Sequence, residues 1–278
     1  MSISLTNTLI KLNNHLQDTF DSTTTSAGNA AKTTLVDSAL SKYDDGYFGE
    51  ANNQQEWWVY YASQLRTIKG FTSSSGTIEV HSPFSAQVTT ATAYSLHHFD
   101  RNRKIVALNH ALYESFPHFY KMVTDATSLD GKGSSDNKYT VPNTFTEFPT
   151  QIWSIDDTTT DIKRTRITDY EMEEISGTYY FYADITDDED ILLIGKTYLT
   201  QFTNDASTTE LNDAQAEVVS LLAASIFYRN LSQTVNSEDS GRYDSLANRF
   251  LNDYQARVNT GAGMSLILPD KLDWSWCE

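Results

Sequence analysis

The sequence predicts an α+β protein: a helical bundle formed by N-terminal, central and C-terminal helices, with antiparallel β-hairpins and an inserted β-sandwich or small barrel. Near its start, middle and end, apolar residues recur every three or four positions, which is the helical period. Between these segments apolar and polar residues alternate, as in antiparallel strands. The expected divisions are 1–126, with the first helix, strands and central helix; 127–207, sandwich-like; 208–261, the closing helices; and 262–278, an extended tail.

The first expected helix covers residues 3–20. Its apolar stripe consists of Leu5, Leu9, Leu12, Leu16 and Phe20. Residues 21–34 are small and polar and show no periodicity, so we expect an extended segment there. A short helix is expected to follow at about residues 35–43.

From residue 56 to residue 99 the period changes to two, with aromatic and β-branched residues that are typical of antiparallel strands. Within this stretch lies "RTIKGFTSSSGTIEVHSPFS", residues 66–85. A phosphate-binding loop would need a helix after Gly76, but the residues that follow it resemble a strand. The stretch is therefore interpreted as a hairpin whose second strand ends near Pro83 and Phe84.

A central helix is expected over residues 103–123. Its stripe consists of Ile105, Leu108, Leu112, Phe116 and Phe119. Because proline lacks an N–H group and clashes with the preceding turn, Pro117 is expected to divide this segment into two helical pieces.

The loop at residues 127–142 is rich in Gly, Ser and Asp, and it is interpreted as a boundary. Four strand-like runs follow at 150–156, 161–170, 177–185 and 190–202. A β-sandwich or small barrel is the natural way to close such runs.

Two further helices are expected after these strands. Asn212 or Asp213 is a suitable N-cap for the first, and its stripe includes Val218, Leu221, Leu222, Ile226 and Phe227. The second contains Tyr243, Leu246, Ala247, Phe250, Leu251, Tyr254 and Val258. In the tail, Leu272, Trp274 and Trp276 have no helical period, and they are predicted to bind a partner because chain ends are ordered when something holds them.

The net charge of the chain argues against some classes of function. The 37 acidic and 20 basic residues give a net charge of −17, which argues against a surface that binds duplex DNA. This charge suits solubility at high concentration or a channel wall that repels a polyanion. A single cysteine, Cys277, excludes an intramolecular disulfide. No run of 18 apolar residues and no signal peptide are found, so we expect a soluble protein that folds in a cytoplasm without a membrane.

The sequence contains no motif that predicts a catalytic, cofactor or metal site. His98 and Asp100 can share one face of a strand while His97 points the other way, and no further ligands at fixed spacing complete a metal site. The acidic run 186–191 lacks the pattern of a calcium loop and is interpreted as a solvated turn, with a weak divalent site as the alternative. Phosphate-loop, dinucleotide and hydrolase motifs are missing from the sequence.

The first 125 residues resemble a group of tailed-phage virion proteins from the head-tail connector region. The positions that carry the resemblance are Arg66, Ile68, Gly76, Thr77, Ile78, Val80, Pro83, Phe84 and Tyr94. The match covers somewhat under half of the chain. It departs from the group at residues 89–94, "TTATAY", where the group commonly has a glycine-rich "G-D-x-Y".

The resemblance implies a virion structural protein: a ring-forming adaptor of the neck, below the portal, that is assembled in the host cytoplasm. Its implied partners are further copies of the chain, the portal protein and adjacent neck or tail proteins, with DNA passing through without specific binding. A tail-tube, tail-terminator or other neck protein is the structural alternative. Another alternative is a glycan- or receptor-binding module that uses Trp153, Tyr179, Tyr180 and Tyr182. Catalysis ranks last because no nucleophile or carboxylate pair stands out.

Overall fold

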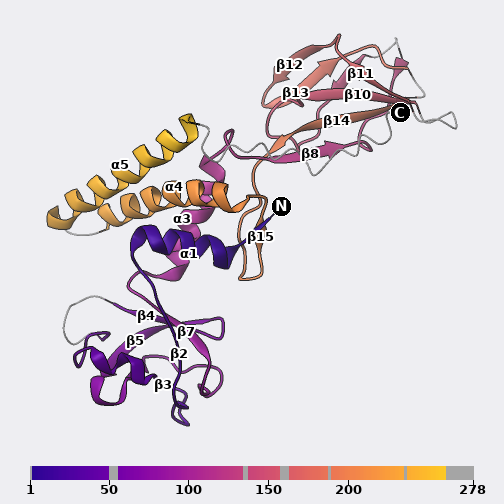
Figure 1. The fold of residues 1–278 in the computed structure, drawn as a ribbon. Helices are drawn as coiled ribbons and strands as arrows, with labels where there is room; N and C mark the ends of the chain where they lie inside the picture. Colours follow the sequence, from indigo (N-terminus) through magenta and orange to yellow (C-terminus); the bar gives the residue numbers. More distant parts are fainter. Residues whose placement is uncertain are drawn as a thin grey trace. The chain divides into compact units, whose positions relative to one another are not determined.

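The fold mixes helices with antiparallel sheets, as the sequence predicts at this coarse level. The computed structural model describes residues 2–49, 56–133, 137–156, 163–186, 189–234 and 237–260. Among them it has four α-helices and four antiparallel sheets, none of which forms a barrel, so the small-barrel alternative is wrong for the described sheets (Figure 1). Two compact units are present. One comprises residues 112–200, and the other combines residues 2–111 with residues 201–260.

A sheet of six strands lies in the second of these units, here called the discontinuous unit. Its strands are β2 (Phe20–Thr23), β3 (Thr34–Val36), β4 (Trp58–Tyr61), β5 (Gln64–Thr72), β6 (Thr77–Val80) and β7 (Ala93–His97), in the order β2-β7-β4-β5-β6-β3. Its core includes Val59, Ile68, Ile78 and Leu96, all fully buried. β2 confirms that the segment after residue 20 is extended, since it pairs with β7.

The hairpin predicted at residues 66–85 is confirmed. β5 and β6 pair antiparallel, joined by a 3-10 turn at Ser73–Ser75 and by Gly76 in the left-handed region at φ 59°. The guanidinium of Arg66 holds the far end of the hairpin, because its Nε donates to the Pro83 carbonyl at 3.1 Å. Phe84 is 2% exposed. The small residues of this stretch are thus the bend between two strands.

A buried carboxylate fixes the hairpin against its neighbours. Asp37 is fully buried and accepts hydrogen bonds from the Ser22 hydroxyl at 2.6 Å, the Tyr94 hydroxyl at 2.6 Å and the Ala39 N–H at 2.8 Å. Its own N–H donates to the Gly76 carbonyl at 2.9 Å. Burial, followed by the hydrogen bond to Asp37, raises the pKa of Tyr94 above its ordinary value.

The short helix expected at residues 35–43 forms only as the 3-10 helix η1 (Ser38–Lys42), capped by Asp37. β3 takes the residues before it because they pair with β6. The first helix is also shorter than expected. α1 (Leu5–Leu16) ends at Gln17, which is left-handed at φ 52°, and Phe20 belongs to β2.

The other helices are α3 (Arg101–Glu114), α4 (Asp213–Ser232) and α5 (Ser237–Asn259). Asn212 caps α4 as predicted and forms a reciprocal capping box with Gln215. Most of α4 is buried, and it packs against α1 and α5. β1 (Ile3–Ser4) pairs with β15 (Thr208–Thr209), which joins the first residues to the later part of the unit. Of the helices in the described ranges, none is long and apolar enough to cross a membrane.

The second helical piece expected after Pro117 is wrong. α3 ends at Glu114, and Lys121–Asp125 forms the strand β8, which pairs with β14 (Asp190–Thr197). The spacing of Phe116 and Phe119 covers only one turn, which is too short to establish a helical period. Pairing with β14 instead satisfies the backbone groups of this segment.

The unit of residues 112–200 contains two antiparallel sheets. Their further strands are β9 (Lys138–Thr140), β10 (Gln151–Asp156), β11 (Lys163–Ile167), β12 (Glu171–Ile175) and β13 (Thr178–Tyr182). The sheet orders are β11-β10-β14-β8 and β12-β13-β9. Tyr139, Ile152, Phe181 and Leu193 come from both sheets and share one buried cluster. The four predicted runs are therefore strands, while the exposed, glutamate-rich β12 was not expected.

We predict that Gly76→Ala lowers the free energy of unfolding by about 2–4 kcal/mol. An added Cβ would lie 2.0 Å from the Asp37 carbonyl oxygen, on a backbone with φ of +59°. Gly70→Ala is the matched control, because no atom lies within 4 Å of its Cβ and its effect should stay below about 1 kcal/mol. Urea denaturation measures both variants, and equal stabilities would contradict the assigned clash.

Candidate functional site

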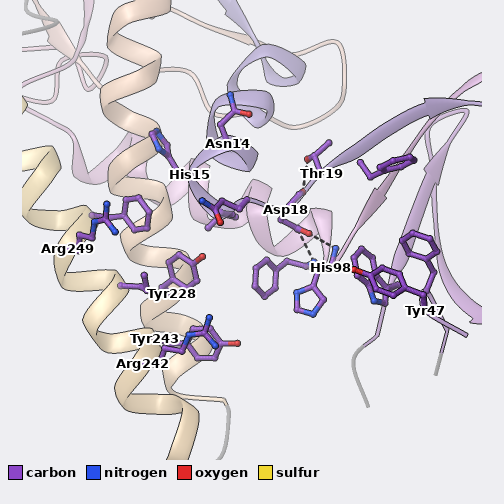
Figure 2. Close-up of a pocket in the computed structure, with 18 of the residues that line it drawn as sticks. Asn14, His15, Asp18, Thr19, Tyr47, His98, Tyr228, Arg242, Tyr243 and Arg249 are labelled. Atoms are coloured by element: carbon purple, nitrogen blue, oxygen red, sulfur yellow. Dashed lines mark hydrogen bonds between the residues drawn. The ribbon is translucent and has the colours of Figure 1, made fainter. Parts of the chain in front are cut away.

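A groove of about 800 Å³ lies in the discontinuous unit (Figure 2). We call it the helix–sheet groove, because its lining comes from the end of α1, the loop before β4, the residues after β7, and helices α4 and α5. Its volume lies within the range of about 300–1,000 Å³ that is usual for ligand sites. Much of the lining is aromatic, including Tyr43, Tyr47, Trp57, Phe99, Tyr228 and Tyr243.

The aromatic side chains of the groove pack against one another in a continuous series. Tyr228 stacks between Tyr243, at 5.8 Å and 19°, and Phe250, at 5.9 Å and 7°. Phe99 meets Tyr228 edge-on at 6.4 Å. Tyr47, with 42% exposure, offers a large apolar face to solvent. Tyr228 is thus buried between two rings, and Tyr47 is the aromatic side chain of the lining that is most open to solvent among these.

Two arginines of α5, Arg242 and Arg249, also line the groove (Figure 2). Their spacing of seven residues places them on one face of the helix. Both are exposed, and neither side chain forms a hydrogen bond or ion pair with a described residue. In a protein with a net charge of −17, these two guanidinium groups make the groove locally cationic.

Asp18 also lines the groove, but its carboxylate is fully engaged. It accepts hydrogen bonds from the N–H groups of His98, at 2.5 Å, and Phe99, at 2.9 Å, drawn as dashed lines in Figure 2. It also lies 2.6 Å from the Nζ atom of Lys104. The side chains of Asp18 and Lys104 are 2% and 0% exposed. This ion pair thus joins the residues after α1, the residues after β7, and α3.

The Lys104 ammonium has three protons and four acceptor atoms nearby, two of which are the Oδ2 and carbonyl oxygens of Asp18. Besides Asp18, these are the Asn13 Oδ1 atom at 2.7 Å and the His97 Nδ1 atom at 3.2 Å. Nδ1 of His97 also lies 3.4 Å from the Asp18 carbonyl oxygen, and its Nε2 lies 2.8 Å from the Ser95 hydroxyl, so both ring nitrogens have polar partners. Burial, and then the charge of Lys104, lower the pKa of His97 to about 3. Burial also lowers the pKa of Lys104, although the charge of Asp18 opposes this shift.

A second pocket of about 510 Å³ in the same unit is lined by Tyr60, Arg101 and Asp205. Arg101 donates to the Asp205 carboxylate at 2.7 Å, and its guanidinium lies 4.2 Å from the centre of the Tyr60 ring. Tyr60 also donates to Asp205. Burial by itself would raise the pKa of Asp205, but the hydrogen bonds from Tyr60 and Arg101 hold it below its usual value. These three groups satisfy one another in the wall of the pocket.

The candidate partner-binding and metal-ligating residues named from the sequence do not come together in one site. Leu272, Trp274 and Trp276 lie outside the described residues, and so does part of the acidic run 186–191. His97 belongs to the buried Lys104 network, and Asp100 caps α3 by accepting from the Asn102 N–H at 2.8 Å. Within the described ranges no three His, Cys, Asp or Glu side chains are grouped to hold a metal ion.

The groove itself was not predicted. The sequence interpretation took Tyr243 and Phe250 as core residues of a helical stripe, whereas both are only half-buried and line the groove. The available signal was the placement of Arg242 and Arg249 beside them, at the same spacing of seven. No protein-family model and no curated protein sequence matches the chain.

We predict that Lys104→Met lowers the free energy of unfolding by about 3–5 kcal/mol, because it leaves the Asp18 carboxylate buried without a cation. Lys69→Met is the matched control. Its partner Glu79 is 2.8 Å away, but the two side chains are 53% and 48% exposed, so the loss should stay below about 1 kcal/mol. Urea denaturation distinguishes the two variants. Similar losses of unfolding free energy for the two variants would show that the buried ion pair stabilises the protein no more than the exposed one does.

Acid should destabilise the protein through His97. Its pKa is about 3 in the folded chain and 6.5 as the reference value, so between these values the unfolded state binds more protons. Stability is therefore fully present above pH 6.5 and falls as the pH drops towards 3, by up to about 1.4 kcal/mol per pH unit. We predict a shallower decline for His97→Gln, measured by urea denaturation from pH 7.5 to 4.5. Parallel curves would exclude His97 as the group responsible.

Proposed function

We propose that the protein is a non-enzymatic structural protein of a tailed-phage virion, a head-tail connector or adaptor. Copies of the chain would form a ring below the portal protein, contact adjacent neck or tail proteins, and let DNA pass without specific binding. Assembly would take place in the host cytoplasm. In this proposal the helices form a bundle, and the two sheets of residues 112–200 form an inserted β-sandwich.

The observation that carries the proposal is the exposed edge strand β12. All five of its residues are exposed, including Met172 at 60% and Ile175 at 41%. Met172 is paired with the buried Phe181, so it lies on the core side of the sheet but beyond the core. Among the described strands β12 pairs with β13 alone. β12 is thus an open edge strand with two exposed apolar side chains among three glutamates, and an open edge can pair with a strand of a neighbouring subunit.

Charge also supports a conduit. A net charge of −17 disfavours adhesion of DNA phosphates to the protein, as a channel wall requires. The residues that carry the resemblance to connector proteins, such as Ile68, Ile78 and Val80, are buried in the six-stranded sheet. Their role in this chain is structural, which is compatible with a family marker.

A tail-tube, tail-terminator or other neck protein is the structural alternative, and it differs in the symmetry of the assembly. The glycan-binding alternative now depends on fewer residues. Tyr179 packs on the core cluster, and Trp153 belongs to the other sheet. Tyr180 and Tyr182 remain on the opposite face of β13, where the Lys138 Nζ atom lies 4.1 Å and 5.3 Å from their ring centres. Partly exposed rings beside a lysine are the observation that favours this alternative.

We predict that the purified chain forms closed rings with a central channel, visible by negative-stain microscopy and counted by mass photometry. Met172→Asp should raise the protein concentration needed for assembly at least about tenfold, because it places a charge at the apolar edge. Val106→Asp, at an exposed apolar position on α3 with 51% exposure, is the control and should assemble normally. Monomers at every concentration would contradict the proposal, and monomers retained on a glycan column would support the binding module.

A further inference from the structure

The helix–sheet groove combines two features that call for a particular occupant. Its exposed aromatic faces suit flat apolar side chains, and its two arginines lack carboxylate partners among the described residues. An occupant that satisfies both features is acidic and aromatic. We propose that the groove binds the chain's own C-terminal segment, residues 268–278, "LPDKLDWSWCE". This assignment does not depend on the virion role proposed above.

Charge favours this segment. It contains Asp270, Asp273 and Glu278 against one cation, Lys271, and so has a net charge of −2. Most of the protein surface repels such a segment, since the whole chain has a net charge of −17. Arg242 and Arg249 give the groove two positive charges that attract the segment. Arginine also binds carboxylates through two parallel N–H donors, which adds direction to the attraction.

The aromatic composition of the segment matches the groove as well. Trp274 and Trp276 are two residues apart, so in an extended segment both side chains point the same way. The half-exposed ring of Tyr47 and the partly exposed ring of Tyr243 offer stacking faces. Guanidinium groups favour the face of tryptophan above other rings. Each tryptophan can therefore contact both an aromatic face and an arginine.

The chain can reach its own groove. From Asn259 back to Arg242, α5 covers about 26 Å at the helical rise of 1.5 Å per residue. The 14 residue-to-residue steps from Thr260 to Trp274 can span about 46–50 Å when extended. A tether of this length gives an effective concentration of the order of millimolar, so the chain's own segment outcompetes that of another molecule at ordinary protein concentrations.

The test uses the full chain, a variant that ends at Ile267, and a synthetic peptide of residues 268–278 labelled with fluorescein at its N-terminus. Fluorescence anisotropy should show saturable binding to the shortened variant and at least tenfold weaker binding to the full chain, whose groove is occupied. Arg242→Gln with Arg249→Gln in the shortened variant should weaken binding at least tenfold. Arg257→Gln, on the same helix but outside the lining, should leave it unchanged.

Two further measurements keep the outcome clear if a variant folds poorly. A peptide with Trp274→Ala and Trp276→Ala should bind the unaltered shortened chain at least tenfold more weakly. In the full chain, hydrogen–deuterium exchange of Tyr43–Phe48 should be slower than in the shortened variant. Absence of saturable peptide binding, or equal binding to both chains, would overturn the proposal. So would a dimer of the full chain that truncation dissolves, because the occupant would then come from a second copy.

Discussion

The buried ion pair of Asp18 and Lys104 is the constraint on which the discontinuous unit depends. A carboxylate and an ammonium without solvent are costly unless every lone pair and proton has a partner. Here the partners come from separate parts of the chain: Asn13 of α1, His97 of β7, and the two N–H groups that follow β7. The pair therefore stabilises one relative placement of the helices and the six-stranded sheet, and the helix–sheet groove lies beside it.

Asp37 is a second buried carboxylate whose hydrogen-bond partners are brought together by the fold, here within the six-stranded sheet. Its buried carboxylate needs the donors of Ser22, Tyr94 and Ala39, which lie on β2, β7 and η1. Its backbone also contacts Gly76 at the bend of the β5–β6 hairpin. The stretch that first suggested a phosphate loop is thus tied to a buried hydrogen-bond network, and its serines have no chemical role in this interpretation.

In this acidic protein, charged side chains have different roles in the core, on strand β12 and in the helix–sheet groove. Asp18, Asp37 and Asp205 are held by specific donors and stabilise the fold. The exposed carboxylates of β12 disfavour unspecific pairing of an open strand edge, and Met172 is the exposed apolar side chain through which we propose a neighbouring copy binds. The arginines of the groove make it locally cationic, and in our proposal they bind the acidic tail.

The sequence by itself determined the class of the fold, most element positions and the hairpin at Gly76, because periodicity and turn residues act over a few neighbours. It misjudged residues 121–125, whose strand depends on a partner some 70 positions later in the chain. It did not reveal β12, whose glutamates carry no alternation. The tertiary structure alone decided the site: Asp18 and Lys104 are far apart in sequence, and Arg242 borders a groove only because α5 packs beside α4. These contacts join residues that are distant in the sequence. The local spacing of residues does not indicate which of them will be neighbours in the fold.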